Sequence, residues 1–231
     1  MTQKPINRIP ITPSPAIASF NYTDISEGTG IVSFYGYSTD QEGTRDFQLS
    51  TNTFFSDEVA SSGASHITTA GTFDMFDFDL TQFNLPKTLK GTATLQIPWM
   101  NTVSGNESNN VSMVAVLKKW DGTTETDITS GASDYISVTG SGGVSGNSKQ
   151  LSLVSMDVPK TNFARGDILR LTIQAAVQSA SGYGVLAVAH DPQNRDEGSD
   201  DLLFPGTTGF TVGTNIDTTT MKLDIPFRLD I

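Results

Sequence analysis

The sequence predicts an all-β fold, an antiparallel β-sandwich of jelly-roll type that follows an extended N-terminal arm. From about Gly30 to Ile231, apolar and polar residues alternate in short runs, and this two-residue period is that of half-buried strands. Gly, Ser, Thr, Asn and Asp residues close each run, as they do at turns. No stretch has the period of an amphipathic helix. Many short strands joined by such turns are typical of a sandwich or barrel.

Residues 1–29 form the predicted arm. Pro5, Pro10, Pro13 and Pro15 exclude a helix there and favour extended chain. We expect the arm to lie along its own domain or along a neighbouring subunit. The apolar arm residues expected to contact a partner are Ile6, Ile9, Ile11 and Ile17.

Residues 30–231 form the predicted sandwich domain, with about ten strands. The sharpest pattern places Phe76 and Phe78 on one face of a strand and Asp77 and Asp79 on the other. The predicted strands are residues 30–38, 45–55, 73–83, 88–100, 110–120, 124–128, 133–139, 149–158, 168–177, 184–190 and 219–231.

Local signals mark turns and bulges between and within these strands. Asp121-Gly122 predicts a hairpin turn. Pro226 lies inside the last strand, which predicts a sheet edge or a bulge at that position. Gly36 and Gly91 are lone glycines in strand patterns and are further bulge candidates.

Composition limits the classes of function. The net charge is −11 and the pI about 4.4, which argues against nucleic acid because phosphate binding needs clustered Lys and Arg. The chain has no cysteine, so thiolate catalysis and Cys-ligated metal sites are excluded. We expect no signal peptide and no membrane segment, because no long apolar run occurs.

Three groups of residues could carry chemistry, and each has a plainer explanation. His66 and His190 are the histidines, but no GxSxG motif accompanies them, and we expect loop or strand-end positions instead. The acidic segment 191–201 could bind calcium, although its spacing is not that of an EF-hand, and a solvated loop is the expected alternative. Asp77 and Asp79 could hydrolyse glycosides, but an exposed polar strand face is favoured.

Aromatic residues could form a surface patch. Alternation turns Tyr35 and Tyr37 outward together, as expected for a sugar- or protein-binding surface or for a face covered by the second sheet or the arm. Trp99 and Trp120 are further candidates for stacking on a sugar.

Four segments together carry a resemblance over about the last half of the chain. They are residues 119–128 (KWDGTTETDI), 158–173 (VPKTNFARGDILRLTI), 189–195 (AHDPQNR) and 225–231 (IPFRLDI). In this order they resemble structural proteins encoded by tailed viruses of bacteria and archaea. The resemblance implies a capsid decoration, minor capsid or tail protein, and it brings no catalytic residues.

The predicted function is therefore that of a non-enzymatic virion structural protein without cofactor or metal. Expected partners are the major capsid protein or tail and vertex proteins, together with further copies of the chain in a homo-oligomer such as a trimer. The expected location is the virion, with no contact to nucleic acid or membrane. One alternative is a carbohydrate- or receptor-binding module of a tail or fibre, and another is a glycoside-processing enzyme built on Asp77 and Asp79.

Overall fold

The computed structural model describes residues 29–41, 44–53, 61–66, 69–103, 105–144, 146–182, 184–190 and 220–228. These residues form twelve strands and no helix, which confirms the predicted all-β class. Since they include no helix, none of them forms a helical membrane span. The predicted contact residues Ile6, Ile9, Ile11 and Ile17 lie outside the described residues, as does the acidic segment 191–201.

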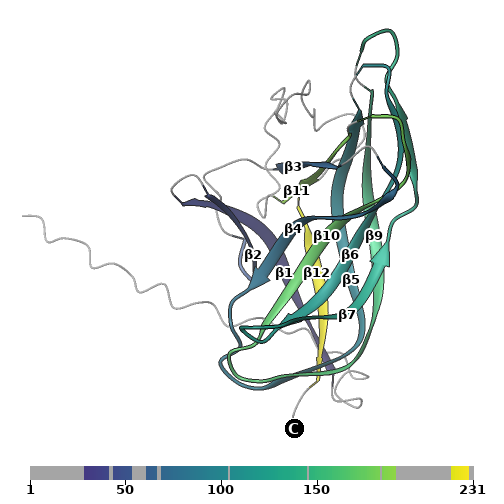
Figure 1. Ribbon diagram of the computed structural model, residues 1–231. Coiled ribbons are helices and arrows are strands. Elements are labelled where there is room, and N and C mark those ends of the chain that lie inside the picture. Colours follow the sequence, from purple (N-terminus) through teal and green to yellow (C-terminus); the bar gives the residue numbers. More distant parts are fainter. Residues whose placement is uncertain are drawn as a thin grey trace, which may run out of the picture.

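The strands vary widely in length, and the long strands β5, β6, β9 and β10 run along the length of the molecule (Figure 1). Their bounds are β1 (Thr29–Gln41), β2 (Thr44–Ser50), β3 (Ser61–His66), β4 (Gly71–Leu80), β5 (Lys87–Val103), β6 (Ser108–Trp120), β7 (Glu125–Ala132), β8 (Ile136–Thr139), β9 (Gly146–Phe163), β10 (Ile168–Ala180), β11 (Gly184–Ala189) and β12 (Lys222–Arg228).

The strands belong to one hydrogen-bonded sheet. Its order is β3-β11-β5-β12-β1-β2-β4-β10-β6-β7, with β8 paired to β6 and β9 paired to β5. The prediction of a purely antiparallel sheet is wrong at one point, because β2 and β4 run parallel. A parallel pair needs a crossover connection, and the chain between these two strands passes through β3 at the far end of the sheet order. The sheet is therefore mixed.

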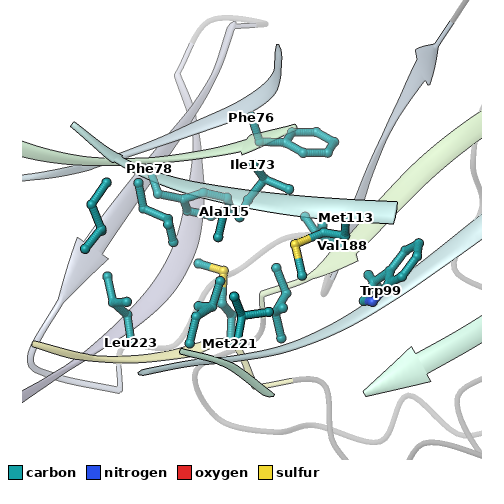
Figure 2. Packing of buried hydrophobic residues seen from close by; sticks show 14 of the residues in the cluster. Phe76, Phe78, Trp99, Met113, Ala115, Ile173, Val188, Met221 and Leu223 are labelled. Carbon is teal, nitrogen blue, oxygen red and sulfur yellow. The ribbon is translucent and has the colours of Figure 1, made fainter. Parts of the chain in front are cut away.

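The core lies between two parts of this sheet that face each other. Figure 2 shows Phe78 and Ile173 on one side of the core, with Met221 and Leu223 on the other. All four side chains are fully buried and belong to one continuous hydrophobic cluster. Along β4 the burial alternates residue by residue from Phe76 to Leu80, because successive side chains of a strand point to opposite faces.

Pro226 is accommodated by an interruption in the pairing of β12. The strand lies between β1 and β5, so it is not an edge, and its pairing with β5 shifts register between Asp224 and Phe227. Gly91 of β5 lies opposite with φ of +127°, and a Cβ built there would be 3.2 Å from the Cβ of Pro226. The bulge alternative for Pro226 is thus the correct one.

Gly36 is not a bulge. Its strand pairs with β2 in continuous register through Gly36 and Leu49. A Cβ at this position would lie 2.0 Å from the terminal methyl carbon of Met221. The glycine therefore allows β1 to pack closely on the core.

The predicted hairpin at Asp121-Gly122 joins β6 to β7. The Asp121 carboxylate accepts hydrogen bonds from the backbone N–H groups of Thr124 at 2.7 Å and Thr123 at 2.9 Å. These bonds lower the pKa of the Asp121 carboxyl. Gly122 has φ of +94°, a conformation that favours glycine. The turn fixes how β7 pairs back on β6 and so places Glu125 beside Trp120.

Gly91 offers a test of the bulge. We predict that Gly91→Ala lowers the free energy of unfolding by about 2 kcal/mol, because an alanine at this φ is strained and its Cβ crowds Pro226. Urea denaturation measures the change. Gly142→Ala is the matched control, since Gly142 also has positive φ but a Cβ there meets nothing within 4 Å. Equal losses in the two variants would contradict the crowding.

Candidate functional site

Three carboxylates of β4 share the outer face of the sheet. Asp77 and Asp79 alternate with the buried Phe76 and Phe78. Asp74 would fall on the buried face in a regular strand, but the pairing with β10 shifts between Ile173 and Gln174. Met75 is the additional residue of this bulge, and the bulge brings Asp74 to the same face as the other two carboxylates.

Each of these carboxylates accepts a hydrogen bond from the residue opposite it on β10. Three register pairs result, Asp79 with Arg170, Asp77 with Thr172 and Asp74 with Gln174. The shortest donor–acceptor distance is 2.6 Å in all three pairs. Cross-strand partners of this kind fix the side chains of both strands.

Arg170 is the centre of the arrangement. Its Nε and Nη2 donate to the two carboxylate oxygens of Asp79 at 2.6 and 2.8 Å. Its Nη1 donates to Glu125 at 2.8 Å and lies 3.5 Å from Asp77. The guanidinium also lies over the ring of Trp120, 4.7 Å from the ring centroid. The hydrogen bonds to Asp79 are the main reason that the pKa of Arg170 is raised.

Lys118 holds the other oxygen of Glu125. Its Nζ lies 2.9 Å from Glu125 and 3.9 Å from Asp74, and its side chain is 7% exposed. Burial alone would lower the pKa of Lys118, but the hydrogen bond to Glu125 and the neighbouring carboxylates raise it above the ordinary value. Burial would likewise raise the pKa of Glu125, but hydrogen bonds from Lys118 and Arg170 lower it.

These six residues form what we call the carboxylate network: Asp74, Asp77, Asp79, Lys118, Glu125 and Arg170. Four carboxylates face two cations, so the network carries an excess of negative charge. Asp77 lies farther from the guanidinium, at 3.5 Å, than Asp79 and Glu125 do, and its side chain is 44% exposed. It is therefore well placed to accept a further cation.

A groove of about 460 Å³ opens beside the network. Its apolar wall is formed by Phe47, Met75 and Phe76. Its polar wall is formed by Gln48, Asp77, Asp79 and Arg170. The parallel pairing of β2 with β4 sets Gln48 beside Asp79, whereas the ring of Phe47, the preceding residue, contacts the rings of Phe76 and Phe78.

The polar row continues onto β1. Tyr37 lies opposite Gln48 in the register, and its hydroxyl donates to Gln48 Oε1 at 2.6 Å. Tyr35 and Tyr37 are both half-buried and alternate with the buried Phe34. Burial raises the pKa of Tyr37. Of the two tyrosines predicted as a surface patch, the structure therefore connects Tyr37 to the groove.

The two tryptophans are engaged within the protein. Trp99 is fully buried, and its indole N–H donates to Ser152 Oγ at 2.8 Å. Trp120 is half-buried, with Arg170 over its ring. The expectation that Trp99 stacks on a sugar is wrong, because alternation inside β5 turns that ring into the core.

The histidines take structural positions where the structure describes them. His190 is fully buried and contacts the rings of Phe47 and Phe78, with centroid separations of 5.6 and 6.0 Å. His66 ends β3, where its backbone pairs with Gly184.

No metal cluster occurs in the described ranges, where no three His, Cys, Asp or Glu side chains are placed to hold an ion. Glycoside hydrolysis by Asp77 and Asp79 is disfavoured by their contacts. Asp79 gives both oxygens to Arg170, and Asp77 accepts the Thr172 hydroxyl.

Sequence reasoning identified the acids of β4 but not their partners. Arg170, Lys118 and Glu125 come from three other strands, and Gln48 comes from a fourth. One signal was present, since Arg170 is a cation between Leu169 and Leu171 in an otherwise uncharged strand. Such a residue is expected on the outer face opposite an acid, but its strand neighbour is known only from the topology.

The fold is similar to parts of solved hydrolases. An α-amino acid ester hydrolase labelled with selenomethionine matches with a TM-score of 0.53 and 10% identity, over 85% of this chain and 36% of that chain. A CocE/NonD family hydrolase from Staphylococcus aureus matches with a TM-score of 0.38 and 12% identity, over 84% of this chain and 36% of that chain. An aminopeptidase from a marine sediment Thaumarchaeota archaeon matches with a TM-score of 0.45 and 7% identity, over 85% of this chain and 37% of that chain.

The chain thus spans little more than a third of the length of these structures. At 10% identity, the likeness to the α-amino acid ester hydrolase establishes a shared fold. No family model matches the chain, and no curated protein matches it in sequence.

This likeness corrects the predicted function. The α-amino acid ester hydrolase, whose fold this chain shares in part, is an enzyme, whereas the sequence predicted a non-enzymatic capsid decoration or minor capsid protein. This finding contradicts both predictions, that of a capsid protein and that of a protein without enzymatic function. The physical reason is that an alternating strand pattern reports burial and carries no information about what the outer face binds. The predicted homo-oligomer and virion location stay predictions.

The lowered pKa of Glu125 predicts a pH dependence. Its stabilising contribution is complete above the ordinary value of 4.5 and is lost as the pH falls through the lower value of the folded state. We therefore expect Glu125→Gln to lose less stability than the wild type as the pH falls below about 4.5, measured by urea denaturation at each pH. Asp134→Asn, at an exposed residue outside the network, should keep the wild-type slope. An unchanged slope in Glu125→Gln would contradict the prediction.

The pair of Arg170 and Asp79 predicts a coupling energy. In a double-mutant cycle with Arg170→Met and Asp79→Asn, we expect the two residues to couple by about 1 to 2 kcal/mol, because the pair is bidentate and partly shielded from water. Thermal and urea unfolding of the four proteins measures it. The control cycle uses Thr88→Ala and Asn162→Ala, an exposed cross-strand pair with a hydrogen bond of 3.0 Å. A coupling for Arg170 and Asp79 no larger than that of this pair would refute the central role of the guanidinium.

Proposed function

We propose that the chain works in a hydrolase, as a β-domain whose groove binds a small substrate that carries both an amine and an apolar group. The observation that carries this proposal is the groove, which Asp77 and Asp79 line together with Phe47 and Met75. The role proposed for these residues is substrate binding within an enzyme.

We further propose that the sheet forms a sandwich of jelly-roll type. Buried side chains of β4, β6 and β10 face those of β5, β11 and β12 across one core (Figure 2). Such an arrangement leaves the outer face of β4 and β10 available for a ligand. The similarity to part of an α-amino acid ester hydrolase supports this architecture.

The amine is assigned to Asp77. Its Oδ1 accepts the hydroxyl of Thr172 at 2.6 Å, and its Oδ2 is 3.5 Å from Arg170 Nη1. A carboxylate oxygen has two lone pairs, so Oδ2 can accept a further charged donor. The excess negative charge of the carboxylate network also attracts a cation to the groove.

The apolar group is assigned to the opposite wall. Met75 and Phe47 are half-buried, so their side chains keep surface that a ligand can cover. Covering apolar surface contributes roughly 25 cal/mol for each Å² removed from water. A cation with an apolar group would therefore satisfy both walls, whereas a simple inorganic cation would leave the apolar wall exposed to water.

The substrate class that we propose is that of α-amino acid esters. Such an ester joins an amine, a side chain and a carbonyl group around one carbon. The solved hydrolase of similar fold is named for this class of compound, and the two walls of the groove suit its amine and an apolar side chain.

Binding of L-phenylalanine methyl ester tests the proposal. We expect chemical-shift changes confined to the groove residues, and we expect Asp77→Asn to weaken binding about tenfold, because a charged hydrogen bond is lost. Asp134→Asn is the control, since it removes the same charge from an exposed residue outside the network. Wild-type protein that binds no ester, or equal weakening in both variants, would overturn the proposal.

A further inference from the structure

Gln48 is the neutral polar residue of the groove wall. We infer that its amide N–H₂ group donates a hydrogen bond to the carbonyl oxygen of the bound ligand, and that Tyr37 holds the amide in the orientation this requires. This inference rests on the proposed function, because it names what the same groove recognises besides the amine.

The position of Gln48 is set by two neighbouring strands. On one side it pairs with Tyr37 of β1, and on the other it pairs with Asp79 of β4. It is half-buried and lines the groove together with Asp77 and Asp79. Backbone pairing on both sides fixes where the side chain leaves the sheet.

Tyr37 fixes the rotation of the Gln48 amide. The amide has one acceptor oxygen and two N–H donors, and the Tyr37 hydroxyl donates to the oxygen at 2.6 Å. With the oxygen engaged by β1, the amide presents its nitrogen as the group that a ligand can meet. Burial raises the pKa of Tyr37, which keeps the hydroxyl in its donating form at neutral pH.

The other polar side chains of the groove are engaged with one another. Asp77 and Asp79 are acceptors when ionised. Each of the three nitrogens of Arg170 donates to Asp79 or Glu125, and Nη1 also lies 3.5 Å from Asp77. Gln48 is thus the neutral lining residue that has N–H donors to offer a carbonyl group.

The spacing suits a ligand that has an amine and a carbonyl on adjacent carbons. Gln48 lies opposite Asp79, and Asp79 is two residues along β4 from Asp77. Two residues of a strand span roughly 7 Å and neighbouring strands lie roughly 4.8 Å apart, so the backbone positions of Gln48 and Asp77 are about 8.5 Å apart. An ammonium group and a carbonyl oxygen separated by two carbons can bridge that span with one hydrogen bond at each end. Tyr37 is accordingly a positioning residue, and Gln48 is the residue that discriminates between ligands.

A matched pair of ligands tests the inference on the full chain. L-Phenylalanine methyl ester has the carbonyl group, and 2-phenylethylamine has the same amine and ring without it. We expect Gln48→Leu and Gln48→Met to weaken binding of the ester about five- to tenfold by titration calorimetry, since one neutral hydrogen bond is lost. Binding of 2-phenylethylamine should stay within about twofold of wild type for Gln48→Leu. For Tyr37→Phe we expect about threefold weaker ester binding and unchanged amine binding.

The controls separate this inference from the proposed function. Tyr35→Phe removes a hydroxyl from the same strand two residues away and should leave both affinities unchanged. If Gln48→Leu weakens both ligands equally, or neither, the carbonyl assignment is overturned while the groove remains a binding site for amines. If neither ligand binds the wild-type chain, the proposed function fails and this inference fails with it. If Gln48→Leu does not fold, Gln48→Met keeps the length of the side chain without a charge and decides the question.

Discussion

The pairing of Arg170 with Asp79 connects the fold to the candidate site. It joins β10 to β4, and Glu125 extends the same guanidinium to β7. Trp120 lies against one side of the guanidinium, so the charge is held between an aromatic ring and three carboxylates. Charge-assisted, partly shielded bonds of this kind are stronger and more directional than exposed pairs. They hold the outer face of four strands in one arrangement.

Two irregularities turn that polar face into a groove. The bulge at Met75 moves Asp74 onto the face of Asp77. The parallel pairing of β2 with β4 brings Gln48 beside Asp79 on that face. Bulges and crossovers interrupt the regular ladder, and such places are common next to functional sites.

Prediction from the sequence succeeded where the period of a single strand decides the outcome. The alternation of Phe76 and Phe78 with the acids of β4 gave the buried and exposed faces correctly, and Asp121-Gly122 gave the turn. Prediction failed where the environment of a side chain depends on which strand lies beside its own. The burial of Trp99 and the partners of Asp77 depend on which strand lies alongside, and residues 95 positions apart in the chain supply one of those bonds. Function was misjudged because strand periodicity does not report what a face binds.

The sequence by itself determined the all-β class, the turn before β7 and the apolar face of β4, because each depends on residues close together in the chain. Tertiary structure alone decided the parallel pair, the bulge that gathers three carboxylates, and the meeting of Gln48, Asp77 and Arg170. The physical reason is that a strand specifies which side chains point outward but not which other strand will lie beside it. Strand pairing is settled by the packing of the whole core, and the groove is a product of that pairing.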